Sequence, residues 1–114
     1  MAFRPSKTYV IAMTSSASAA QALTATGLTS GDDSRMRQIQ VTGDVAVIVK
    51  FGDNAVAADR TVTSNALADG NFYQPAGVPM LYDLTGAQTH ISGILASGST
   101  AGSLYVTVGI GEDI

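Results

Sequence analysis

The sequence predicts an all-β protein: an antiparallel β-sandwich of jelly-roll type, with little or no helix. Three observations support this prediction. Apolar residues alternate with polar or small ones over short runs, which is the spacing of a half-buried strand. Residues that favour turns recur about every ten positions, as in sandwiches and small barrels. Large apolar residues do not follow the spacing of a helical stripe in any long segment.

The segment from 36 to 52, MRQIQVTGDVAVIVKFG, carries the strongest alternation and predicts a β-hairpin. Thr42-Gly43-Asp44 interrupts the alternation at its centre. A two-residue loop would mix polar and apolar residues on both faces, so a three-residue loop is preferred. This register places Ile39, Val41, Val45, Val47 and Val49 on one face, and Gln38, Gln40, Ala46, Ile48 and Lys50 on the other.

Residues 1–7 are expected to form an N-terminal arm, because the residue before Pro5 favours extended backbone. Residues 8–114 then form a single β-sandwich domain, a size that allows a buried core. The segment TYVIAM at 8–13 is predicted to be a strand with apolar residues on both faces, covered on both sides. The Ala-rich segment that follows is interpreted as a strand around 21–26, with a polar turn at 29–34.

The second half of the chain repeats the pattern of short strands and turns. The stretch from 53 to 74 contains short apolar pieces and a turn at 69–71, but no clear long strand. Gln74-Pro75-Ala76-Gly77 fits a type I turn. Strands are predicted at 78–84, 89–96 and 103–108, with Pro79 at a strand start or a sheet edge. Leu104, Val106 and Val108 are expected to point inward, and the tail from Gly109 to be a flexible terminus.

Composition limits the function classes. Charged residues are only 13% of the 114, while 46% are hydrophobic, so the surface must be covered mostly by small, uncharged residues. Such a surface suits a protein that works inside an assembly. The net charge of −3 and the scattered basic residues argue against a nucleic-acid-binding surface. The chain has no cysteine and no apolar run of about 20 residues, so a thiolate metal site and a membrane span are not expected.

Neither a catalytic residue, nor a cofactor, nor a metal site is expected. His90 is the single histidine and has no ligand pattern around it. The acidic pairs Asp32-Asp33 and Glu112-Asp113 lack the series of further oxygen ligands that calcium requires. The motif at 109–111 resembles a phosphate-binding loop but has no helix after it. Asp83 could be part of a glycosidase pair, but aromatic residues, which line sugar clefts, are only 6% of the chain. The protein is therefore not expected to be an enzyme.

The order of its segments resembles that of small virion proteins of tailed bacteriophages. The relevant pieces are the basic arm FRPSKTYV, the segment SSASAAQALTA, the predicted hairpin RQIQVTGDVAVIVKFGDNAV, the segment QPAGVPMLYDL, and the closing pair THISGILASG and GSLYVTVGIGE. The chain is similar to head decoration (cement) proteins, which adopt β-sandwich or jelly-roll folds.

This resemblance implies a structural protein on the capsid surface of a virion, assembled in the host cytoplasm. Its partners would be the major capsid protein and further copies of this chain, without nucleic acid, membrane or cofactor. The candidate interface residues are Phe3, Arg4, Tyr9, Phe72 and Tyr73, because aromatic residues and Arg dominate interface energetics. Core packing is the alternative for Tyr9, Phe72 and Tyr73. A carbohydrate-binding module, or a neck or tail component of the particle, is the alternative function.

Overall fold

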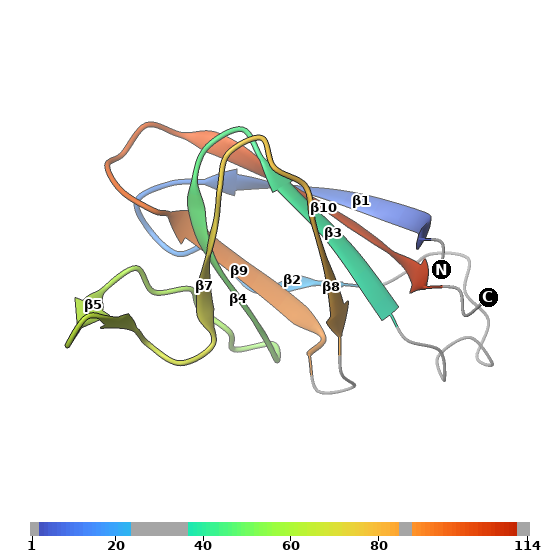
Figure 1. Cartoon of the computed structure of the whole chain (residues 1–114), viewed down its shortest axis with the longest axis horizontal. Helices are drawn as coiled ribbons and strands as arrows, with labels where there is room; N and C mark the ends of the chain where they lie inside the picture. Colours follow the sequence, from blue (N-terminus) through green and yellow to red (C-terminus); the bar gives the residue numbers. More distant parts are fainter. Residues whose placement is uncertain (1–2, 24–36, 85–87, 112–114) are drawn as a thin grey trace.

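The structure, a computed structural model, describes residues 3–23, 37–84 and 88–111. These residues form strands and no helix, and the strands build two four-stranded antiparallel sheets (Figure 1). In spatial order the first sheet contains β1 (Phe3–Met13), β10 (Gly102–Gly111), β3 (Arg37–Gly43) and β8 (Met80–Leu84). The second contains β2 (Gln21–Ala22), β9 (His90–Leu95), β4 (Val47–Gly52) and β7 (Asn71–Gln74). The prediction of an all-β, antiparallel protein is confirmed, and the arrangement is consistent with a β-sandwich.

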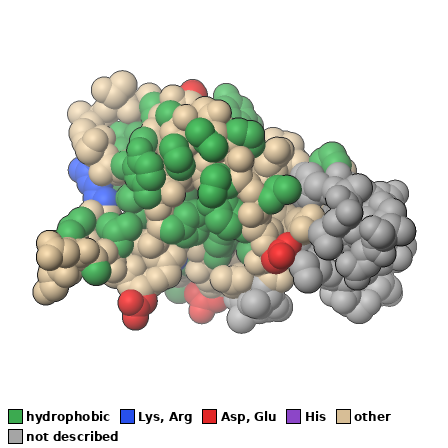
Figure 2. All heavy atoms as spheres, in the orientation of Figure 1, with side chains coloured by type: hydrophobic (Ala, Val, Ile, Leu, Met, Phe, Trp, Pro, Cys, Tyr) green, Lys and Arg blue, Asp and Glu red, His purple; other side chains and the backbone are tan. Residues whose placement is uncertain are grey.

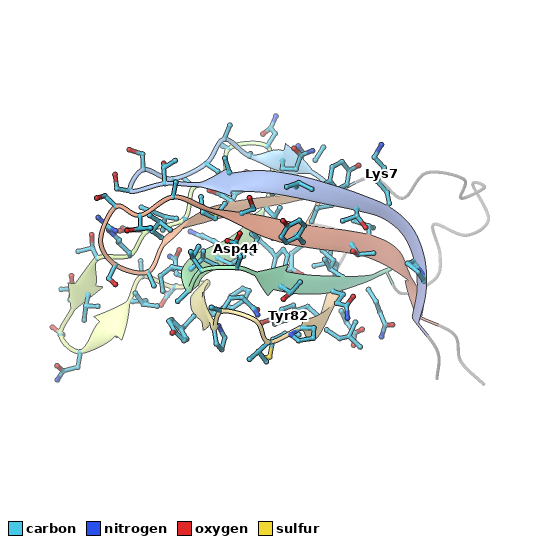
Figure 3. The ribbon with its side chains drawn as sticks, turned by 90° about the horizontal axis from the view of Figure 1, so that it is seen from above. Lys7, Asp44 and Tyr82 are labelled. Atoms are coloured by element: carbon cyan, nitrogen blue, oxygen red, sulfur yellow. The ribbon has the colours of Figure 1, made fainter. Side chains whose placement is uncertain are left out.

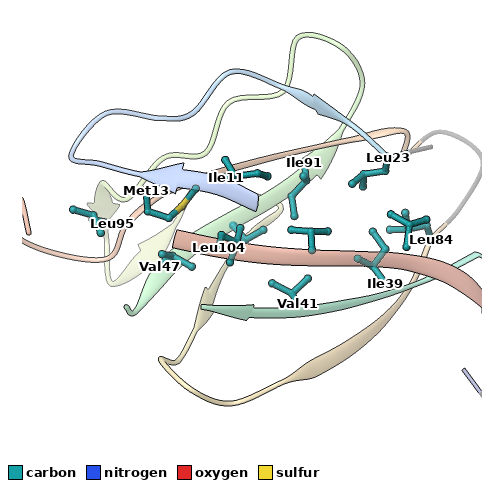
Figure 4. Packing of buried hydrophobic residues seen from close by; sticks show 13 residues of the cluster. Ile11, Met13, Leu23, Ile39, Val41, Val47, Leu84, Ile91, Leu95 and Leu104 are labelled. Carbon is teal, nitrogen blue, oxygen red and sulfur yellow. The ribbon is translucent and has the colours of Figure 1, made fainter. Parts of the chain in front are cut away.

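The hydrophobic core lies between the two sheets, because every long strand turns one row of apolar side chains inward (Figure 4). The first sheet contributes Ile11, Met13, Ile39, Val41, Leu84, Leu104, Val106 and Val108, and the second contributes Val47, Val49, Ile91 and Leu95, with Leu23 beside them. Full burial of one such branched side chain is worth about 1.5–3 kcal/mol. The expected inward rows of the 36–52 segment and of β10 are therefore correct.

The predicted hairpin at 36–52 is wrong, although its faces are right. β3 pairs with β10 and β8, whereas β4 pairs with β9 and β7, so the chain crosses from one sheet to the other after Gly43. Asp44 holds this crossing. Its amide donates to the Ser103 carbonyl at 3.2 Å, and its side-chain Oδ1 accepts from the Ser103 amide at 2.7 Å. Two strands that face each other across a core also bury matching rows, so alternation alone could not distinguish the two arrangements.

β1 begins at Phe3 rather than at residue 8. Residues 3–7, expected to be an arm, belong to this strand, with a register shift between Pro5 and Lys7. Their partners are the last residues of β10, so the tail at 109–111 is strand and not a flexible terminus. β1 is also covered on one side only, because Ile11 and Met13 are buried while Val10 is 63% exposed.

The remaining strands agree with the predictions in part. β8 and β9 lie inside the predicted ranges, and β8 starts directly after Pro79. β2 covers only two residues of the segment expected at 21–26, and the rest of that segment and the turn at 29–34 lie outside the described residues. The 53–74 stretch holds a hairpin that the sequence analysis did not predict, made of β5 (Val62–Thr63) and β6 (Ala66–Leu67). Its tip, Ser64-Asn65, has φ values of 52° and 65°.

Candidate interaction surface

The outer face of the second sheet is covered by the chain itself. Ile48 of β4 and Ile94 of β9 point away from the main core and pack against Ala58 in a small second cluster. Leu67 of β6 and Ala96 pack against the same cluster. Residues 53–70, which connect β4 to β7, therefore lie over this face. They occupy surface that a partner could otherwise contact.

Hydrogen bonds attach this connecting segment to the second sheet. The buried Ser92 hydroxyl accepts from the Ala58 amide at 3.0 Å and donates to the Ser18 carbonyl at 2.8 Å. Arg60 donates from Nη1 to the carbonyls of Leu95, at 3.2 Å, and Gly98, at 3.0 Å. A buried hydroxyl with both bonds satisfied is stable in a sheet, whereas the same hydroxyl without partners would oppose folding.

The outer face of the first sheet is not covered by any strand of the described chain. Its side chains alternate with the inward rows of the same four strands. They are Thr8, Val10 and Ala12 of β1, Ser103, Tyr105 and Thr107 of β10, Gln38, Gln40 and Thr42 of β3, and Leu81 and Asp83 of β8. We call these eleven residues the open face. β1, β10 and β3 lie side by side when seen from above in Figure 3.

The open face carries one charged residue, Asp83, at the β8 edge, where its carboxylate accepts a hydrogen bond from Gln38 Nε2 at 2.9 Å; its other ten members are neutral. Val10 lies directly opposite Tyr105, and both side chains are exposed. Leu81, which is 55% exposed, lies opposite Gln40 on the far edge. Thr8 and Thr107 share a hydrogen bond of 2.9 Å between their hydroxyl oxygens. Most of this surface can be dehydrated at small cost, because its one ion, Asp83, lies on the edge strand β8 and the rest of the face is neutral.

A second apolar area lies on the side of the molecule where β7 and β8 form the sheet edges (Figure 2). Phe51, Phe72 and Tyr82 pack as a cluster there, with ring centroids 5.0–5.7 Å apart. Burial raises the pKa of the Tyr82 phenol above its usual value. The phenol donates to Oε1 of the buried Gln74 at 3.2 Å, while Gln74 Nε2 donates to the Val78 carbonyl at 2.6 Å. These contacts close the gap between the two sheets at this edge.

The five predicted interface residues do not form one surface. Phe3, Arg4 and Tyr9 lie on β1, at one edge of the first sheet, whereas Phe72 and Tyr73 lie on β7, at the edge of the second sheet near β8. Phe72 and Tyr9 are partly buried and pack against the core. Lys7 Nζ lies 5.7 Å from the centroid of the Tyr9 ring. Tyr73 is 55% exposed.

The polar residues considered for chemistry are dispersed. His90 is half-buried, and its Nδ1 lies 2.8 Å from the Thr89 hydroxyl. Asp83 accepts a hydrogen bond from Gln38 Nε2 at 2.9 Å. The pairs Asp32-Asp33 and Glu112-Asp113 lie outside the described residues. Within the described ranges, no three His, Cys, Asp or Glu side chains are grouped so that they could hold a metal ion. The described part of the chain also forms no helix that could span a bilayer.

The open face was not predicted from the sequence. Its signal was present in the outward positions of two predicted strands, at Val10 and Tyr105, which are large and apolar where a solvated face would carry charges. Their proximity depends on the pairing of β1 with β10, at opposite ends of the chain, which local alternation does not specify.

The fold and this surface define a small, all-β protein in which the chain covers one outer sheet face, while no described strand covers the other, a face with a single charged residue. Comparison with protein-family models, curated proteins and solved structures finds no match to this chain.

Proposed function

We propose that the chain is a non-enzymatic structural protein of a bacteriophage virion, a decoration (cement) protein that binds the major capsid protein and stabilises its lattice. The observation that carries this proposal is the outer face of the first sheet, which no described strand covers and on which Asp83 is the one charged residue. An exposed apolar patch with a polar surround is typical of a protein interaction site. The resemblance in the order of sequence segments supplies the kind of partner.

We further propose that the sandwich is a jelly roll, a fold used by viral capsid proteins and by lectins. A jelly roll forms when a long hairpin of eight strands rolls up, so that the first strand pairs with the last and each following strand pairs inward. The eight main strands pair in this way: β1 with β10, β2 with β9, β3 with β8, and β4 with β7. The hairpin of β5 and β6 is an insertion between the fourth and fifth main strands.

The open face is suited to binding a flat partner surface, because the two surfaces can fit together and release the water between them. Its exposed apolar side chains, Val10, Tyr105 and Leu81, are spread across the full width of the sheet. The threonines and Gln40 between them can exchange hydrogen bonds with water for bonds to a partner. Burial of such a surface at many identical positions on a shell would add together, because each bound copy bridges neighbouring subunits.

The test is binding to shells assembled from a major capsid protein encoded beside this chain. Purified protein is mixed with shells that lack it, and the shells are sedimented. We expect saturable binding at a fixed number of copies per shell, and a higher temperature of shell disruption in the presence of the protein. Absence of the protein from the pellet at saturating concentration would contradict the proposal.

Two charge substitutions locate the contact. Tyr105→Lys places a charge in the open face and should abolish binding to the shells, because a buried unpaired charge is costly. Val62→Lys is the matched control, since Val62 is also exposed but lies on the β5–β6 hairpin, attached to the other sheet. Deletion of residues 1–7 would not be informative, because it removes part of β1 from the first sheet. Equal binding by both variants would contradict the role of the open face.

A further inference from the structure

β1 is an edge strand that pairs with no described strand on its outer side, and its edge differs from the other three edges of the two four-stranded sheets. β8, β7 and β2 are edge strands of five, four and two residues, whereas β1 has eleven. Proteins protect long edges with prolines, lysines and bulges, because an exposed edge pairs readily with another strand. β1 carries Pro5, the register shift after it and Lys7, all in its first half. The half from Thr8 to Met13 has none of these devices.

The direction of the backbone groups along this half follows from one hydrogen bond. The Ser103 carbonyl accepts from the Asp44 amide, which continues β3, so Ser103 and every second residue after it direct their backbone groups toward β3. Leu104, Val106 and Val108 therefore direct theirs toward β1, where their partners are Ile11, Tyr9 and Lys7. Because backbone groups alternate along a strand, those of Thr8, Val10 and Ala12 point out of the sheet at its edge.

We propose that two copies of this chain pair along this edge, antiparallel about a two-fold axis at Val10, so that their first sheets join into one sheet. Val10 then pairs with its own copy, and Thr8 pairs with Ala12 of the other copy. The outward groups of these three residues would form about six backbone hydrogen bonds between the copies. The pairing ends at the register shift after Pro5 and at Thr14, whose carbonyl is already bonded to the Leu95 amide.

A second copy fits this edge in charge and in shape. Lys7, the one charged residue between the register shift and Met13, would lie opposite Met13, so like charges do not meet. Tyr9 would lie opposite Ile11, and aromatic side chains pair favourably with β-branched ones across strands. On the outer side, two Val10 side chains would meet at the axis with a Tyr105 beside each, which explains why these apolar residues are exposed in the single chain.

This self-association deepens the proposed function by naming one partner of the virion protein, but its test needs no capsid. Failure of the pairing would leave capsid binding untouched, and failure of capsid binding would leave the pairing untouched. One pair of strands buries less surface than the roughly 1,200 Å² of a standard interface. The dimer is therefore expected to be weak in solution, and it must be measured at high protein concentration.

Cysteine cross-linking tests the register, because the chain has no cysteine of its own. In Val10→Cys the two new thiols would lie at the axis, where Cα atoms of a hydrogen-bonded pair are about 5.5 Å apart, within the range of a disulfide. Mild oxidation should convert most of this variant to a covalent dimer that retains the β-type circular dichroism of the parent. Leu81→Cys is the control, since Leu81 is similarly exposed on the same face but lies on β8 at the opposite edge.

Sedimentation equilibrium of the unmodified chain provides the second measurement. We expect reversible dimers, and we expect Val10→Lys to weaken their association at least about tenfold, because two lysines would then oppose each other. Leu81→Lys should leave the association unchanged. A strictly monomeric parent chain, cross-linking of Leu81→Cys as efficient as that of Val10→Cys, or equal loss of association in both lysine variants would each overturn the proposed edge.

Discussion

At the scale of the residue, Gly93 lets the two sheets approach closely. A Cβ atom built on Gly93 would lie 2.7 Å from Met13 Sδ and 3.0 Å from Met13 Cε. Gly93 belongs to β9 of the second sheet, and Met13 to β1 of the first. Because the methionine side chain fills the space that a larger residue would need, the two positions depend on each other.

Gly93→Ala should lower the free energy of unfolding by about 1–3 kcal/mol, because the added methyl group displaces the Met13 thioether in a packed core. In a Met13→Ala background the same change should cost less, with a coupling of at least about 0.5 kcal/mol. Urea denaturation of the four proteins in this cycle measures both values. Gly77→Ala, where no atom lies within 4 Å of the added Cβ, should show no coupling to Met13. Equal costs of Gly93→Ala in both backgrounds would contradict the proposed contact.

Residue by residue, the sequence was most informative about the inward rows. Alternation identified Ile39, Val41, Val47 and Val49 correctly, because the side chain of every second residue in a strand must face the same way. It did not identify Gln74 as fully buried, since an amide is buried only where specific partners exist. Those partners are Tyr82, on β8 in the other sheet, and the carbonyl of Val78, in the segment that leads into β8.

At the scale of the element, a buried hydroxyl, that of Ser92, helps to hold the segment before β5 over the second sheet. Ser92→Ala should lower the free energy of unfolding by about 1–3 kcal/mol, because the Ala58 amide and the Ser18 carbonyl lose their partner. The Ala58 amide should also exchange its hydrogen faster than in the parent chain. Ser97→Ala, at an exposed position, is the control and should have little effect on either measurement. Unchanged protection of Ala58 would show that this hydroxyl does not fasten the segment.

The start of the β5–β6 hairpin depends on an acidic side chain. The Thr61 amide donates to Asp59 Oδ1 at 2.9 Å, and this bond, with a further one from the Thr61 side chain, holds the pKa of Asp59 below its usual value. A carboxylate with a lowered pKa in the folded state stabilises that state above the pKa of the unfolded chain, near pH 4. This stabilisation is lost as the pH falls through the folded-state pKa.

We therefore expect the parent chain to be more stable than Asp59→Asn at neutral pH, and the difference to disappear as the pH is lowered below about 4. Unfolding free energies of both proteins between neutral and acidic pH measure this difference. Asp69→Asn, on an exposed turn, controls for the general loss of a negative charge. A difference that does not change with pH would contradict the role of the Asp59 carboxylate.

Strands were predictable where the alternation is long. The pairing of strands was not predictable where it depends on the path of the chain through a turn. β8, β9 and β10 were located from their period, whereas the crossing after Gly43 was mistaken for a hairpin loop. The bonds between Asp44 and Ser103 that direct this crossing join positions 59 residues apart. β5 and β6 are each two residues long, too short for a period to be detected.

At the scale of the whole molecule, the two outermost strands of the sequence are paired with each other. β1 and β10 join Phe3 to Gly111 and Met13 to Gly102. Pairing between distant segments slows folding, because a long loop must close before any contact forms. The same distance explains why composition predicted a surface with few charges but could not say which face would expose apolar residues. The open face exists only after both ends of the chain have met.

A circular permutant tests this view of the fold. Joining the two ends with a short Gly-Ser linker and opening the chain in the exposed loop at 97–101 should preserve both sheets, because Phe3 and Gly111 are already partners. The permutant should refold faster than the parent chain, since β1 and β10 become a local hairpin. Stopped-flow refolding from urea measures the rates. Slower refolding would show that the pairing of these two strands does not limit the reaction.

The hairpin of β5 and β6 has a consequence for the use of this protein as a carrier. Among the described strands, β5 and β6 pair only with each other, their tip at Ser64-Asn65 is exposed, and Leu67 of β6 packs on the sheet opposite the open face (Figure 1). A foreign peptide inserted between these two residues would interrupt neither main sheet. In a particle bound through the open face, as proposed above, the inserted epitope would point toward the medium, as a vaccine scaffold requires.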